Sequence, residues 1–154
     1  MVKNLGRPPD ARELVDRVWR IKASASPAWG RMTAGQMVCH LTDAIRMVFG
    51  EKRVNGKETW LSRTLIRWIA IHTNAPWRKN YPTTPEMEQN GGGGTAPRAF
   101  TQDRDDLVQS IERFASLPAS HSFPRHPYFG AMTREEWMTW AYRHIDHHLR
   151  QFGV

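Results

Sequence analysis

The sequence predicts an all-α fold, and the spacing of apolar residues is the main reason. In five segments the apolar residues recur every three or four positions, as they do on a helix with one buried face. Three of these segments begin with a capping box, in which Thr or Asp is followed three positions later by Glu or Gln. No segment of useful length alternates apolar and polar residues as a half-buried strand does.

The first predicted helix covers about residues 11–22. Asp10 and Glu13 form its capping box, which would satisfy two free backbone N–H groups at the helix start. The apolar face that follows consists of Leu14, Val15, Val18 and Trp19.

The second predicted helix follows the capping box of Thr33 and Gln36 and ends at Gly50, because glycine readily adopts the left-handed conformation common after a helix. The third predicted helix covers about residues 57–73. Residues 74–100 are rich in proline and glycine, so we expect this segment to be irregular and partly mobile.

The fourth and fifth predicted helices complete the chain. The fourth covers about residues 103–117 and stops before Pro118. Thr133 and Glu136 form the third capping box, before a helix over about residues 134–152. We therefore expect five helices in all.

The lengths of the connections predict how the helices are arranged. The first and second helices, and the fourth and fifth, are joined closely enough to be antiparallel neighbours, whereas about 50 residues separate the second helix from the fourth. This favours a four-helix bundle of the first, second, fourth and fifth helices with up-down-down-up topology. The third helix would then lie in one long crossover.

Composition limits the class of protein. At 154 residues the chain can bury the core of one domain, so we expect a single domain over residues 1–154. The opening residues lack the apolar segment of a signal peptide, and arginines interrupt the longest apolar stretch, so we expect no membrane segment. Cys39 is the only cysteine, which excludes an internal disulfide and favours a reducing, cytoplasmic setting.

The formal net charge of +7 raises the question of nucleic acid binding. The basic residues are scattered over every segment, and no signature of a nucleic-acid-binding motif is present. We therefore do not expect nucleic acid as a partner. A diffuse positive charge suits a small anionic molecule at least as well, and a small-molecule substrate is the expected partner.

Three histidines form the sharpest chemical signal. His144 and His148 are four residues apart on the apolar face of the fifth helix, close enough to bind one metal ion. Histidines near a helix C-terminus also interact favourably with the helix dipole without being ligands. His40 lies on the apolar face of the second helix, where one hydrogen bond could satisfy it as a core residue. If the three converge, they form a divalent metal site with open coordination positions.

Other polar residues near these histidines are weaker candidates. His147 lies on the rim of the same helix face and is either a solvated histidine or a contact for substrate. His126 lies in a predicted loop, where it is either solvated or closes over the site. Gln151 shares the face of His144 and His148 and is a third candidate to orient a ligand or contact substrate. Cys39 should pack as a small apolar residue rather than act as a nucleophile.

Three motifs occur in order along the chain. They are Met32–Met37 leading to His40, the turn His126–Gly130 with the sequence HPYFG, and the ending His144–Phe152 with the sequence HIDHHLRQF. Together they resemble the DinB-like superfamily of small four-helix-bundle metalloproteins. More narrowly, the chain resembles an uncharacterised subgroup with HPxFG and HxxHHLxQF motifs. The resemblance covers nearly the whole chain.

This resemblance implies an up-down-down-up bundle with one divalent ion, typically zinc or nickel. Carried over by motif, the metal ligands are His40, His144 and His148. Better-known relatives transfer low-molecular-weight thiols such as bacillithiol, mycothiol or glutathione to electrophiles. Arg78, Lys79, Arg98 and Arg125 lie in predicted loops or near them and could bind the carboxylates of such a thiol.

Two classes of function follow from the sequence. The first is a metal-dependent enzyme, either a thiol-dependent S-transferase or a hydrolase, because a three-histidine ion can lower the pKa of a bound thiol or water. The second is a non-catalytic metal-binding or dimerising bundle protein. In that case Trp29, Trp60 and Trp77, which lie at helix ends or in loops, would form the contact surface of a homodimer.

Overall fold

The computed structural model describes residues 2–154. Among these residues the regular structure is helical, and the single isolated β-bridge joins His126 to Gly130. The expected all-α class is therefore confirmed. The helical elements are α1 (Pro8–Arg20), α2 (Ala34–Val48), the π-helical η1 (Ser62–Ile66), α3 (Arg67–His72), the 3₁₀ turn η2 (Pro85–Met87), α4 (Phe100–Ala115) and α5 (Arg134–Gln151).

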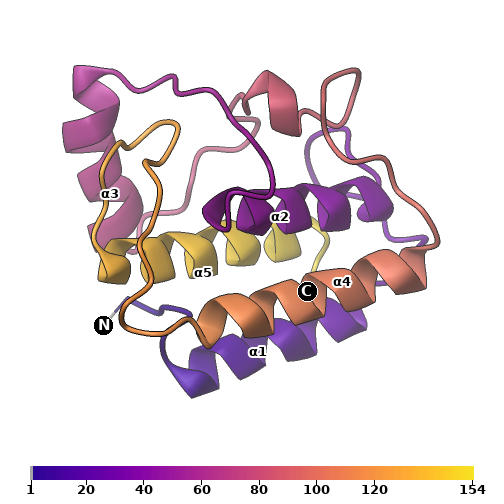
Figure 1. Cartoon of the computed structure of the whole chain (residues 1–154). Coiled ribbons are helices and arrows are strands. Elements are labelled where there is room, and N and C mark those ends of the chain that lie inside the picture. The colour runs from indigo at the N-terminus through magenta and orange to yellow at the C-terminus, as the bar shows by residue number, and fades with distance from the viewer. Residues whose placement is uncertain (1) are drawn as a thin grey trace.

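The four long helices run up, down, down and up (Figure 1). At one end of the bundle the Leu5 N–H donates to the Met138 carbonyl at 3.1 Å, next to the starts of α1 and α5. At the other end Arg17 of α1 reaches the carbonyl of Val154, just beyond α5. These contacts require α1 and α5 to run in the same direction, and Figure 1 shows α2 and α4 running in the opposite one. The predicted topology is confirmed, with α3 in the crossover.

The pairing of neighbours differs from the expectation. The principal contacts join α1 to α4 and α5, and α2 to α4 and α5. Helices α1 and α2, like helices α4 and α5, are antiparallel as predicted. They lie across the bundle from each other, so the prediction that they are neighbours is wrong. The connections 21–33 and 116–133 are longer than the two to eight residues that commonly join neighbouring helices, so they can span the diagonal.

The capping boxes of α2 and α5 are confirmed, and that of α1 is wrong. In α2 and α5 the Thr33 and Thr133 side chains each accept a backbone N–H, and the reciprocal bond is also present. Helix α1 instead begins at Pro8, and the side chain of its N-cap residue does not cap a backbone N–H of the helix. Proline is favoured in a first helical turn because its missing N–H would be unpaired there in any case. Asp10 lies within the helix and accepts the Asn4 N–H at 3.1 Å.

The crossover from α2 to α4 is irregular over residues 74–99 apart from η2, as predicted. The fully buried Asp43 of α2 anchors it. The Asp43 carboxylate accepts the Thr95 N–H at 2.8 Å and pairs with the Lys52 ammonium at 2.9 Å. These contacts hold the crossover against α2, which positions η2 beside His40.

The search for membrane-crossing segments covers the described residues. None of their helices is both long enough and apolar enough to span a bilayer.

Candidate metal centre

His40, His144 and His148 meet between α2 and α5. A ring nitrogen of each lies within 4.8 Å of the corresponding nitrogens of the other two. The closest pair is Nε2 of His40 and Nε2 of His144, which are 3.3 Å apart. We call these three residues the histidine cluster. The structure therefore brings together the three residues for which the sequence predicts metal binding.

The helix positions explain why these rings converge. His144 and His148 are one turn apart on α5, and their ring centroids are 5.0 Å apart. The ring of His40, projecting from α2, lies 5.3 Å from that of His144 and 4.9 Å from that of His148. One side chain of α2 is thus enough to complete a three-histidine group with the pair on α5.

Carbonyl oxygens fix the orientation of two of the three rings. Nδ1 of His40 lies 3.3 Å from the Met87 carbonyl oxygen, and Nδ1 of His148 lies 2.8 Å from Oε1 of Gln151. Because a carbonyl oxygen only accepts, each Nδ1 carries the proton, and each Nε2 presents its lone pair. Such contacts are typical of metal-binding histidines.

Gln151 is itself held in place. Its Nε2 donates to the Trp29 carbonyl at 2.6 Å, which directs its Oε1 toward His148. The structure thus gives this sequence candidate a positioning role. The corresponding contact of His40 was missed by sequence reasoning, because a backbone carbonyl at Met87 leaves no signal in the side-chain pattern.

Burial keeps the histidine cluster uncharged. It lowers the pKa of His40, of which 5% is exposed, below the ordinary value. Burial lowers the pKa values of His144 and His148 well below the ordinary value, and the charges of neighbouring imidazoles lower them further. Neutral imidazoles are the form that binds a metal ion.

Tryptophan side chains enclose the cluster. Trp77, in the loop after α3, is stacked on His144 with a centroid distance of 6.0 Å, and Trp140 of α5 lies 5.1 Å from the same ring. His144 nevertheless keeps partial exposure to solvent. The cluster is therefore largely desolvated, with Trp77 between it and the surface.

His147 lies beside the cluster and outside it. Its half-buried ring contacts Trp29 at 5.7 Å and Trp77 at 6.1 Å, and is 5.2 Å from the ring of His148. Of the two readings that the sequence leaves open, a fully solvated histidine does not match this aromatic surrounding. His147 forms part of the wall next to the cluster.

His126 is buried, so the reading of a solvated loop histidine is wrong. Its Nδ1 accepts the N–H groups of Tyr128 at 3.1 Å and Phe129 at 3.2 Å, which closes its own turn. The ring stacks on Phe129 and contacts Trp140, which in turn contacts His144. Its role in the structure is to hold the HPYFG turn against α5.

The remaining candidates contribute little charge to the cluster. Burial raises the pKa of the Cys39 thiol to about 12, so this residue is an apolar core group, as expected. Arg98 pairs with two carboxylates of α4, and Arg125 pairs with Glu58. The Nζ of Lys79, another predicted loop cation, lies 4.4 Å from the ring centroid of Trp29.

The fold and the histidine cluster define an all-helical bundle protein with a candidate metal centre. The chain matches a family model described as Protein of unknown function (DUF1569) over residues 7–153. It belongs to that family, which is DinB-like. Comparison with curated proteins and with solved structures found no match.

The buried His126 predicts a pH dependence of stability. Burial lowers its pKa to about 3, whereas the unfolded chain should show the ordinary value of 6.5. As the pH falls below 6.5, the unfolded state takes up a proton that the folded state does not, so the free energy of unfolding decreases. This group alone should cost about 2 kcal/mol at pH 5, measurable by urea unfolding at neutral pH and at pH 5.

The matched variant is His126→Asn, whose amide oxygen can replace Nδ1 as the acceptor and does not titrate. Its stability should fall less steeply between the two pH values, by the same amount of about 2 kcal/mol. Equal losses in both proteins would show that His126 is not held neutral by the fold.

Proposed function

We propose that this protein is a metal-dependent enzyme in which His40, His144 and His148 bind one divalent ion. The spacing of the donor atoms supports the proposal. Two nitrogen ligands of a tetrahedral zinc ion are about 3.3–3.4 Å apart. Nε2 of His40 and Nε2 of His144 are 3.3 Å apart. An all-imidazole donor set suits zinc or nickel.

The composition of the site supports catalysis rather than a structural role for the ion. The cluster offers three ligands, whereas structural zinc sites use four. An ion bound in this way leaves coordination positions open and makes a bound thiol or water nucleophilic near neutral pH. The surrounding residues would keep the three imidazoles neutral and oriented, and the rings of Trp77 and Trp140 would exclude bulk water.

We propose two reactions for this centre. A thiol-dependent S-transfer to an electrophile is supported by the resemblance to the DinB-like superfamily, whose better-known members transfer low-molecular-weight thiols. Within that superfamily the chain resembles an uncharacterised subgroup with HPxFG and HxxHHLxQF motifs. Hydrolysis is supported by the chemistry of the site alone, since it needs no second substrate besides water. A low-molecular-weight thiol as co-substrate would also fit a reducing, cytoplasmic setting.

A specific observation favours a second candidate function, self-association. Five large apolar side chains are exposed on η1, on α3 and on the two residues that precede η1. They are Trp60, Leu61, Leu65, Trp68 and Ile69. We call them the α3 face. Trp60 is 72% exposed and Trp68 58%, whereas Trp29 and Trp77 are half-buried. Contiguous apolar patches mark interaction sites, and the commonest partner of a soluble chain is a second copy related by a two-fold axis.

Metal analysis of untagged protein tests the proposed ligands. The wild type should contain about one divalent ion per chain, because three converging neutral imidazoles form a tight site. His40→Ala, His144→Ala and His148→Ala should each lose most of the metal while circular dichroism shows a folded bundle. Wild-type metal content in all three variants would refute the assignment.

Three variants refine this test. His147→Ala should retain the ion, because His147 lies outside the cluster and contacts tryptophans instead. Gln151→Leu should weaken metal binding by about ten- to hundredfold, since it removes the acceptor for His148 Nδ1–H. Gln151→Glu keeps an acceptor there and should bind metal more tightly than Gln151→Leu.

Turnover assays separate the two reactions. For S-transfer, metal-loaded protein should accelerate consumption of a halogenated aromatic or a quinone only when glutathione, bacillithiol or mycothiol is present. For hydrolysis, it should cleave an activated ester without thiol. His144→Ala should abolish either activity. A fully metallated protein without histidine-dependent turnover in either assay would favour the non-catalytic alternative.

Light scattering during size-exclusion chromatography tests the α3 face. The wild type should elute as a dimer, and Leu65→Glu should elute as a monomer because it places a charge within the apolar contact. Trp19→Glu is the matched control, since Trp19 is an exposed aromatic residue on α1 at 45% exposure. A wild type that stays monomeric at high concentration would exclude the homodimer.

A further inference from the structure

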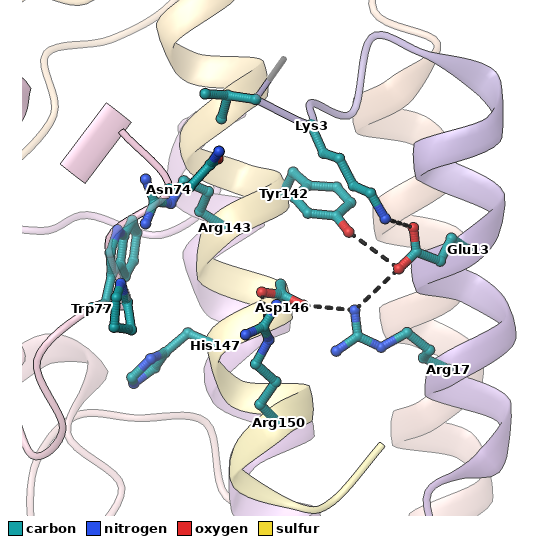
Figure 2. Close-up of a pocket in the computed structure, with 12 residues that line it drawn as sticks. Lys3, Glu13, Arg17, Asn74, Trp77, Tyr142, Arg143, Asp146, His147 and Arg150 are labelled. Carbon is teal, nitrogen blue, oxygen red and sulfur yellow. Dashed lines mark hydrogen bonds and ion pairs between the residues drawn. The ribbon is translucent and has the colours of Figure 1, made fainter. Parts of the chain in front are cut away.

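A cavity of about 490 Å³ opens on the outer side of α5, between α1 and the loop that follows α3 (Figure 2). We call it the α1–α5 pocket. Its volume lies within the range of about 300–1,000 Å³ typical of sites for small molecules. The rings of Trp77 and Tyr142 supply apolar surface, and the other principal lining groups are charged. The three residues of the histidine cluster do not line it.

The α1–α5 pocket carries an excess of positive charge. Its lining contains four cations and two carboxylates: Lys3, Arg17, Arg143, Arg150, Glu13 and Asp146. Both carboxylates are already paired, as Figure 2 shows for Glu13 with Lys3 and Arg17. Asp146 accepts from Arg17 at 2.7 Å and from Arg150 at 2.9 Å. The pocket therefore has a net positive charge, because two carboxylates cannot neutralise all four cations.

Among the described residues, Arg143 is the lining cation that forms no ion pair, and the nearby Asp146 favours its charge only at longer range. Its guanidinium donates to the backbone carbonyls of Thr73 and Ala75, which are neutral. Within the described chain it forms no ion pair with a carboxylate. The Arg143 side chain is half-buried, which raises the free energy of its charge. A bound anion would compensate this cost.

We infer that the α1–α5 pocket binds a small organic carboxylate. The carboxylate pairs with the planar guanidinium of Arg143, which presents parallel N–H donors to both oxygens. The exposed guanidinium of Arg150 adds attraction from the mouth, and the apolar part of the ligand lies against Trp77 and Tyr142. The two fixed carboxylates, Glu13 and Asp146, repel a doubly charged phosphate more strongly than a singly charged carboxylate.

The pocket and the histidine cluster share a wall. Trp77 and His147 line the pocket, and the same two side chains contact His144 and His148 respectively. A ligand in the pocket should thus change the fluorescence of Trp77. The inference does not depend on a bound metal ion, because none of the groups that hold the carboxylate belongs to the cluster.

Binding measurements with matched probes test the inference. The full chain is titrated by calorimetry and ligand-observed NMR with a panel of aromatic and aliphatic monocarboxylates, including 3-phenylpropanoate, and with the neutral amide of each. At least one carboxylate should bind saturably at a single site, and its amide should bind at least about tenfold more weakly, because it lacks the charge-assisted pair. Trp77→Phe should remove the fluorescence change and retain binding.

Variants identify the groups responsible. Arg143→Gln should weaken carboxylate binding by about tenfold or more. Since Arg143 also holds the loop after α3, Arg150→Gln provides a second variant at a side chain that is 68% exposed, and it should weaken binding as well. Arg113→Gln removes the same charge outside the pocket and should leave binding unchanged. His144→Ala should also bind the carboxylate, which separates this site from the metal proposal.

Four results would overturn the inference. They are the absence of saturable binding for every carboxylate in the panel, equal affinity for the carboxylates and their amides, equal affinity for inorganic phosphate, and unchanged affinity in both Arg143→Gln and Arg150→Gln.

Discussion

The structure depends on keeping three imidazoles buried and neutral between α2 and α5. A buried neutral imidazole needs a hydrogen-bond partner for its N–H and another for its unprotonated nitrogen. In His40 and His148 the N–H donates to a carbonyl oxygen. The Nε2 lone pair of His40 then faces Nε2 of His144 at 3.3 Å, where it either accepts a proton from His144 or shares a cation with it. The lowered pKa values of His40 and His148 disfavour an additional proton. A divalent cation would be a partner that all three rings could share, which is the physical basis of the metal proposal.

The crossover between α2 and α4 supplies two contacts to the histidine cluster, a carbonyl oxygen and an aromatic ring. The buried Asp43 fixes the crossover through Thr95 and Lys52, and this anchoring brings the Met87 carbonyl to His40. The preceding loop places Trp77 over His144. The segment between α2 and α4 thus orients one ring of the cluster and covers another. Its irregular backbone is useful here, because a regular helix has its carbonyls engaged in its own hydrogen bonds.

The sequence predicts the helices and the three histidines because both depend on periodicity. Residues 40, 144 and 148 fall on apolar faces, and an up-down-down-up bundle can bring two such faces together. Other features depend on information that the pattern does not contain. The diagonal pairing of consecutive helices is set by loop paths, and the start of α1 by two prolines rather than by Asp10. The burial of His126 could not be predicted, because its partners are backbone N–H groups, which carry no sequence signal.

One stretch of α5 builds both the cluster and the α1–α5 pocket. His144 and His148 project toward α2, whereas Arg143, Asp146 and Arg150 line the pocket on the outer side. The two sets alternate along the helix because its period of 3.6 residues directs them to different sides. A shift of register by one residue would therefore disrupt both sites together. Within this stretch of α5, substitution of a single residue should change one site and spare the other, except at His147, which lies between them and contacts both.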